Sequence, residues 1–146
     1  MRYGLIILLA TISVLVYSCS KGGAPVDDGN GNGNPHVENP SDTTPPVITI
    51  ATPSENQVYN SGNTIHMTGR ISDDLGLYRG TIKLVNDANG LVLKEQAYEI
   101  HGLLGYNFSL SHTAVVTAAS DYTVTVSFED HGLNTVTRSV KVKVNP

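Results

Sequence analysis

From Pro46 to the end of the chain, apolar and polar residues alternate with a period of two. The clearest case is Val124, Val126 and Phe128, which alternate with threonine, serine and glutamate. This period is typical of a β-strand with one buried and one solvated face, because successive side chains point to opposite sides of a sheet. The stretch contains no convincing helical repeat. The pattern therefore predicts an all-β domain over residues 46–146.

Turn signals such as Asn89-Gly90 and His131-Gly132 divide this region into short segments. Seven short antiparallel strands in about 100 residues are typical of a two-sheet sandwich, so that fold is predicted. The strands are expected at residues 47–52, 64–71, 79–86, 91–100, 106–112, 121–129 and 134–144.

The beginning of the chain has a different pattern. Arg2 is followed by an apolar run over residues 5–16. This run is shorter than the roughly 20 residues that a membrane-spanning helix needs. A short apolar run behind a basic residue is typical of a secretory signal peptide, which we expect over residues 1–18. An uncleaved membrane anchor is the alternative.

The run ends in Val16-Tyr17-Ser18-Cys19, which resembles the lipobox of bacterial lipoproteins. Cys19 is the only cysteine of the chain, and an unpaired thiol in an oxidising compartment is reactive unless it is capped. The resemblance implies cleavage before Cys19 and lipid chains on this residue. Two or more acyl chains anchor a protein stably. The chain is therefore expected at the outer membrane or cell surface, with the leaflet left open.

Residues 19–45 are rich in Gly, Asn, Pro and Asp and show no hydrophobic periodicity. Such a segment buries too little apolar area to offset the entropy of ordering it. It is predicted to be a flexible tether with a reach of about 30 Å.

Charge and motifs exclude several classes of function. The formal net charge is −4 at pH 7, which argues against a nucleic-acid partner. The sequence contains no nucleophile elbow and no Gly-rich phosphate loop, and Cys19 is its only cysteine. An enzyme is therefore not expected, and no cofactor other than the covalent lipid is implied.

Three segments resemble motifs of bacterial immunoglobulin-like (Ig-like) domains: TPPVI (44–48), ISDDLGL (71–77) and EDHGLN (129–134). The chain is similar to uncharacterised Ig-like lipoproteins of Bacteroidetes type over nearly all of residues 44–146. The resemblance implies an Ig-like sandwich, with Tyr122 where a tyrosine corner would lie. Such families share no common activity, so the resemblance does not give a function.

If the strands alternate in direction, the loops 72–78, 101–105 and 130–133 share one pole with the start of the domain. Oxygen ligands from several loops suit calcium, and two histidines add zinc as an alternative. The spacing matches no EF-hand or zinc signature, and Asp and Asn are also ordinary turn residues. The candidate ligands are Asp73, Asp74, His101, Glu129, Asp130, His131 and Asn134.

The sequence thus predicts a non-catalytic, membrane-tethered module that presents a surface to an envelope or surface protein. The alternative is a ligand-binding module, for calcium at the acidic pole or for a glycan. A glycan would stack on exposed aromatic rings. The tyrosines considered for this role are Tyr59, Tyr78, Tyr98 and Tyr106.

Overall fold

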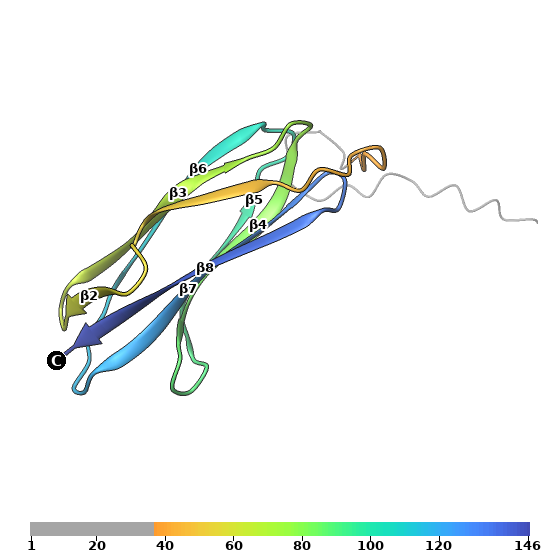
Figure 1. The fold of residues 1–146 in the computed structure, drawn as a ribbon. Helices are drawn as coiled ribbons and strands as arrows, with labels where there is room; N and C mark the ends of the chain where they lie inside the picture. The colour runs from red at the N-terminus through yellow and green to blue at the C-terminus, as the bar shows by residue number, and fades with distance from the viewer. Residues whose placement is uncertain (1–36) are drawn as a thin grey trace, which may run out of the picture.

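The computed structural model describes residues 37–146, which form eight β-strands in two sheets (Figure 1). The predicted signal peptide, Cys19 and the tether up to residue 36 lie outside the described residues. Residues 37–146 contain no helix long and apolar enough to cross a membrane. The strands are β1 (Val47–Thr52), β2 (Gln57–Asn60), β3 (Thr64–Ser72), β4 (Leu77–Asn86), β5 (Val92–Glu99), β6 (Gly105–Thr113), β7 (Ser120–Asp130) and β8 (Thr135–Asn145).

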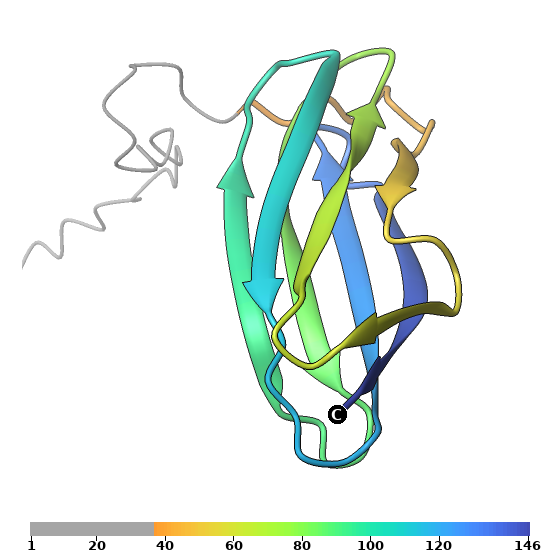
Figure 2. The same cartoon turned by 90° about the vertical axis from the view of Figure 1, so that its left-hand side faces the viewer.

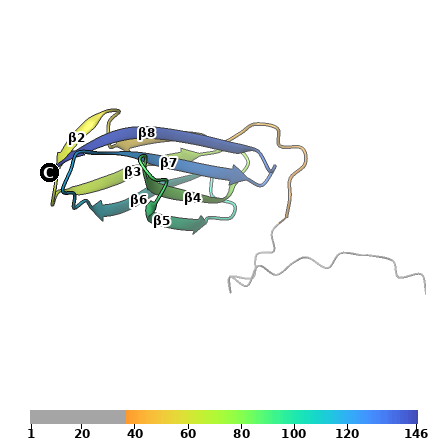
Figure 3. The ribbon, with the colours of Figure 1, turned by 90° about the horizontal axis from the view of Figure 1, so that it is seen from below.

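The smaller sheet has the strand order β1-β3-β6, and the larger sheet has the order β2-β8-β7-β4-β5. The two sheets face each other as the layers of an Ig-like sandwich (Figures 1 and 3). The predicted all-β sandwich is therefore confirmed.

The prediction of seven antiparallel strands is wrong at one edge, because β2 is an eighth strand and pairs in parallel with β8. The chain crosses from the smaller sheet to the larger between β1 and β2. β2 has only four residues, and Tyr59 is its only partly buried side chain. Such a strand is held by backbone pairing, so its sequence shows no alternation to recognise.

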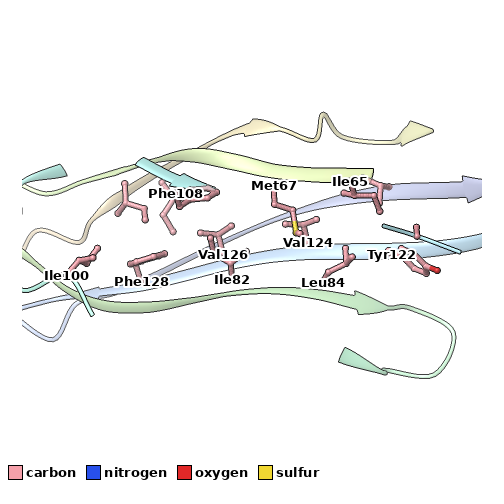
Figure 4. Packing of buried hydrophobic residues seen from close by; sticks show 14 of the residues in the cluster. Ile65, Met67, Ile82, Leu84, Ile100, Phe108, Tyr122, Val124, Val126 and Phe128 are labelled. Atoms are coloured by element: carbon pink, nitrogen blue, oxygen red, sulfur yellow. The ribbon is translucent and has the colours of Figure 1, made fainter. Parts of the chain in front are cut away.

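One hydrophobic core fills the space between the sheets (Figure 4). β7 contributes Tyr122, Val124, Val126 and Phe128, whose alternation is the pattern visible in the sequence. Burying a large apolar side chain contributes roughly 1.5–3 kcal/mol, so this core is the main source of stability. The other buried hydrophobic residues are Ile48, Ile65, Met67, Ile71, Leu77, Ile82, Leu84, Ile100, Phe108, Ala114, Val142 and Val144.

The segment before β1, residues 37–46, lies against the loop between β7 and β8. The Asn39 backbone N–H donates to the His131 carbonyl at 2.8 Å, and the Asn134 side-chain amide donates to the Asp42 carbonyl at 3.1 Å. Asp42 is only 3% exposed. Ordered contacts therefore begin before Pro46, where the hydrophobic pattern begins. Polar contacts of this kind carry no periodicity, so the pattern cannot reveal them.

Candidate functional site

Three loops and the pre-β1 segment (37–46) meet at one end of the sandwich, which we call the tether pole (Figure 2). The loops are 73–76 between β3 and β4, 100–104 between β5 and β6, and 131–134 between β7 and β8. The C-terminus lies at the opposite end (Figure 2). The prediction that these loops share a pole with the start of the domain is confirmed.

Backbone hydrogen bonds join the loops of the tether pole into one surface. The Leu77 N–H donates to the Leu103 carbonyl at 2.9 Å, and the Asp73 N–H donates to the Leu104 carbonyl at 3.0 Å. The His131 N–H donates to the carbonyl of Gly76, also at 3.0 Å. Because each loop is bonded to a neighbour, side chains on different loops keep fixed relative positions.

Two of the predicted ligands, Asp73 and Asp74, come together with a third carboxylate, that of Asp42. One carboxylate oxygen from each residue lies within 4.8 Å of those of the other two. Asp42 is buried, Asp73 half-buried and Asp74 exposed. Sequence reasoning missed Asp42 because it lies in the predicted tether. The available signal was the Asx-turn spacing from Asp42 to Thr44, directly before two prolines.

Turn formation accounts for only one oxygen of each of the two less exposed carboxylates. Asp42 Oδ1 accepts the Thr44 N–H at 3.0 Å. Asp73 Oδ1 accepts the N–H groups of Leu75 at 3.0 Å and Gly76 at 2.6 Å. The Oδ2 atoms of Asp42 and Asp73 are buried without a hydrogen-bond donor. The two turns therefore leave one oxygen of each carboxylate unused.

Asp130 and Asn134 shape the β7–β8 turn and do not join this group of carboxylates. Asp130 is fully buried, and its Oδ1 accepts the Asn134 backbone N–H at 2.8 Å. Its Oδ2 accepts the Asn134 side-chain amide at 3.0 Å. Both carboxylate oxygens of Asp130 are thus bonded inside its own turn.

Glu129 lies one residue earlier, half-buried on β7. Its carboxylate is 3.4 Å from the Arg79 guanidinium, which is itself about half exposed. Exposed pairs of this kind contribute at most about 1 kcal/mol. The structure therefore gives Glu129 a cross-strand ion pair and does not bring it to Asp73 and Asp74.

The two predicted histidine ligands pack with Tyr78 in a cluster of rings. The ring centroids of Tyr78 and His101 are 4.8 Å apart, and those of His101 and His131 are 5.5 Å apart. His131 Nδ1 lies 2.9 Å from the Val37 carbonyl oxygen, and His101 Nε2 lies 3.5 Å from Glu99. The histidines are close to each other, but neither belongs to the group formed by the aspartates.

Two of the tyrosines considered for glycan stacking lie between the sheets. The centroids of Tyr98 and Tyr106 are 5.8 Å apart at an interplanar angle of 62°, and Tyr98 also packs against Phe128. Burial and the neighbouring Tyr106 raise the pKa of Tyr98 above its usual value. Burial also raises the pKa of Tyr59 on β2. A glycan site on these rings stays a prediction.

The tether pole also carries exposed leucines, which sequence reasoning did not single out. They are 47–59% exposed and lie on all three loops of the pole. A leucine in a loop has no periodic partner in the sequence, so only the fold shows that these side chains share one end. The residues are Leu75, Leu103, Leu104 and Leu133.

No protein-family model and no curated protein sequence matches the chain. Among solved structures, it is similar to the fibronectin(III)-like modules of Clostridium thermocellum CbhA, with a TM-score of 0.45 and 11% identity over 67% of this chain and 94% of that one. It is similar to the sporulation control protein Spo0M from Bacillus subtilis, with a TM-score of 0.45 and 10% identity over 70% of this chain and 49% of that one. It is also similar to murine CRIg, with a TM-score of 0.44 and 12% identity over 70% of this chain and 98% of that one. At these scores the likeness says nothing about a ligand or partner.

Proposed function

We propose that this chain is a non-catalytic, membrane-tethered Ig-like module whose tether pole binds a partner protein of the cell envelope or cell surface. The observation that carries the proposal is the set of exposed leucines on three loops that are hydrogen-bonded to one another. Exposed apolar groups gathered at one place are typical of interaction sites. The loops are already ordered, so binding requires little further ordering.

The charges around the leucines favour a protein over a lipid surface. Asp73 and Asp74 directly precede Leu75, and Glu38 lies in the pre-β1 segment. Negative side chains are repelled by the anionic headgroups of a bacterial membrane. An apolar centre with a charged rim is the usual make-up of a protein–protein interface. The expected partner therefore has an apolar patch bordered by basic residues.

In this proposal Cys19 carries the lipid that anchors the chain to the membrane. The lipobox resemblance and the presence of a single cysteine support this assignment. The described chain begins at residue 37, at the same pole as the leucines (Figure 2). A lipid on Cys19 would keep this pole within one tether length of the membrane. A partner at or near the membrane surface would then be within reach.

The test is site-specific photo-crosslinking of the full chain in the cells that encode it. A crosslinker at Leu104, which is 59% exposed, is expected to capture one recurrent protein band. Val115, which is 77% exposed in the loop between β6 and β7, provides the matched control at the opposite pole. The band from Leu104 should disappear when Leu103 and Leu133 are changed to serine. Equal capture at both positions, or capture of lipid alone at Leu104, would contradict the proposal.

The anchor is tested in the same cells with Cys19→Ala. This variant should remain without lipid and leave the detergent phase in a detergent-partition assay. Unchanged partitioning would show that Cys19 does not carry the anchor.

A further inference from the structure

We propose that Asp42, Asp73 and Asp74 bind one calcium ion, which clasps the pre-β1 segment to the sandwich. Their nearest carboxylate oxygens all lie within 4.8 Å of one another. Calcium binds oxygen at 2.3–2.6 Å, so oxygens on different sides of an ion are separated by up to about 5 Å. One ion can therefore reach all three carboxylates. This site does not depend on the partner protein proposed above.

The burial of Asp42 is a separate indication that a ligand is bound here. This residue is only 3% exposed, yet its Oδ2 has no hydrogen-bond donor. Asp73 Oδ2 is also buried without a donor and comes from a different part of the chain. Buried carboxylate oxygens without a partner are unfavourable, and two such groups side by side repel each other. A bound cation removes both costs.

The ion pairs found in residues 37–146 involve other carboxylates. In residues 37–146, Arg79 pairs with Glu129, Lys83 with Glu95 and Lys141 with Asp87. No ion pair to Asp42, Asp73 or Asp74 is found among these residues. The positive charge that the three carboxylates need is thus not supplied by a side chain of the described part of the chain.

The chemistry of the donors selects the ion. All three side chains offer hard oxygen atoms, which suit calcium, whereas zinc prefers nitrogen and sulfur ligands. A shallow hollow beside them is lined by Thr44, Pro45, Val47, Ser72, Asp73 and Asp74, which leaves room for water molecules as further ligands. Calcium tolerates such an irregular mixed shell better than magnesium, which demands octahedral geometry.

The topology explains why this ion would act as a clasp. Val47 pairs with Ser72 at the end of the β1–β3 ladder, so the residues before β1 lie beside the residues after β3. Asp42 also lies tightly against the β7–β8 loop, since a Cβ atom at Gly132 would overlap with the Asp42 carbonyl oxygen. An ion held here joins the pre-β1 segment to the β3–β4 loop, beside the contact that Asp42 makes with the β7–β8 loop.

The experiment measures calcium binding to the full chain, purified in detergent and stripped with a chelator. Titration calorimetry with calcium chloride is expected to show one site with a Kd of about 10⁻⁴–10⁻³ M, the range of extracellular modules. At a hundred times the Kd, the ion should raise the Tm by about 10 °C. No binding up to about 10 mM calcium would overturn the proposal.

The variants Asp42→Asn and Asp73→Asn locate the site. Each keeps an Oδ1 that accepts the backbone N–H bonds of its turn but loses the negative charge. Each should weaken calcium binding at least about tenfold, while the Tm without calcium stays equal or rises, because repulsion between carboxylates is relieved. A purely structural role predicts a lower Tm that calcium does not influence. Wild-type affinity in both variants would overturn the proposal.

Two further variants complete the design. Asp121→Asn makes the same change of charge in an exposed side chain at the opposite pole and should retain wild-type affinity. If it weakens binding equally, calcium is responding to net charge and the proposed site is wrong. Asp74→Asn, at an exposed position, should also weaken binding and gives the same readout if a variant of a more buried aspartate does not fold.

Discussion

Two glycines in the middle of strands make room for the two phenylalanine rings of the core. Gly69 pairs with Phe108 between β3 and β6, and Gly80 pairs with Phe128 between β4 and β7. A Cβ atom on either glycine would overlap with the ring of its phenylalanine partner. Each glycine therefore leaves the space that a ring on the neighbouring strand occupies. The alternation in the sequence shows that both phenylalanines point inward, but finding their glycine partners requires the register.

At this scale we expect Gly80→Ala to destabilise the domain although it adds only one methyl group. The ring of Phe128 must move within a packed core, which costs about 2 kcal/mol. In a domain of this size that lowers the Tm by about 8 °C. Urea unfolding of Gly80→Ala beside Thr81→Ala measures the difference, since the adjacent outward-facing position should lose no more than about 1 kcal/mol. Equal losses at the two positions would mean that the ring contact is unimportant.

At the scale of elements, a buried carboxylate closes the β7–β8 hairpin. Asp130 is fully buried, and the backbone and side chain of Asn134 satisfy one oxygen each. The same Asn134 side chain also donates to the Asp42 carbonyl and so ties the pre-β1 segment to the hairpin. One residue thus joins two elements. The sequence marked Asp130 and Asn134 as candidate metal ligands or turn residues, and their hydrogen bonds agree with turn chemistry.

We expect Asn134→Ala to cost about 2 kcal/mol, because Asp130 Oδ2 loses its donor inside the protein. Asn134→Asp should cost more, since it brings a second carboxylate against the buried one. Chemical denaturation at neutral pH gives both values. Asn89→Ala is the control, because Asn89 accepts a turn hydrogen bond at an exposed position and should lose less than about 1 kcal/mol. If Asn134→Asp were as stable as Asn134→Ala, the proposed repulsion would be absent.

At the scale of the whole molecule, residues 37–146 contain a complete folding unit. The hydrophobic core lies between Ile48 and Val144, and the two sheets are built entirely from strands in this range. The pre-β1 segment adds no side chain to the core, but it contributes polar contacts at the tether pole. Stability and the position of the pre-β1 segment are thus linked through hydrogen bonds at one end of the sandwich.

A fragment of residues 37–146 is therefore expected to give a β-type circular dichroism spectrum and one cooperative melt. A fragment of residues 46–146 should fold in the same way but with about 2 kcal/mol less stability. It loses the bonds from Asn39 to His131 and from Asn134 to Asp42, each worth roughly 1 kcal/mol. Differential scanning calorimetry of both fragments provides the comparison. Identical melting temperatures of the two fragments would show that the pre-β1 segment contributes nothing to stability.

The sequence by itself determined the two-layer sandwich and seven of its strands. In the clearest of those strands, β3 and β7, an inward side chain recurs at every second position, and this repeat depends only on local backbone geometry. The sequence also indicated the pole at which the loops gather, because consecutive antiparallel strands return the chain to the same end. These features can be predicted without knowledge of the strand register or of distant contacts.

Only the tertiary structure decided which polar residues meet at that pole. Asp42 lies about thirty residues before Asp73 in a segment without hydrophobic pattern. Strand β2 likewise has no pattern of its own, because it is held by parallel pairing of its backbone with β8. The exposed leucines lie on separate loops, and Glu129 is drawn to Arg79 across the β4–β7 pair. Contacts of this kind depend on three-dimensional proximity and carry no periodic signal. For that reason the fold was readable from the chain, while the composition of the candidate calcium site was not.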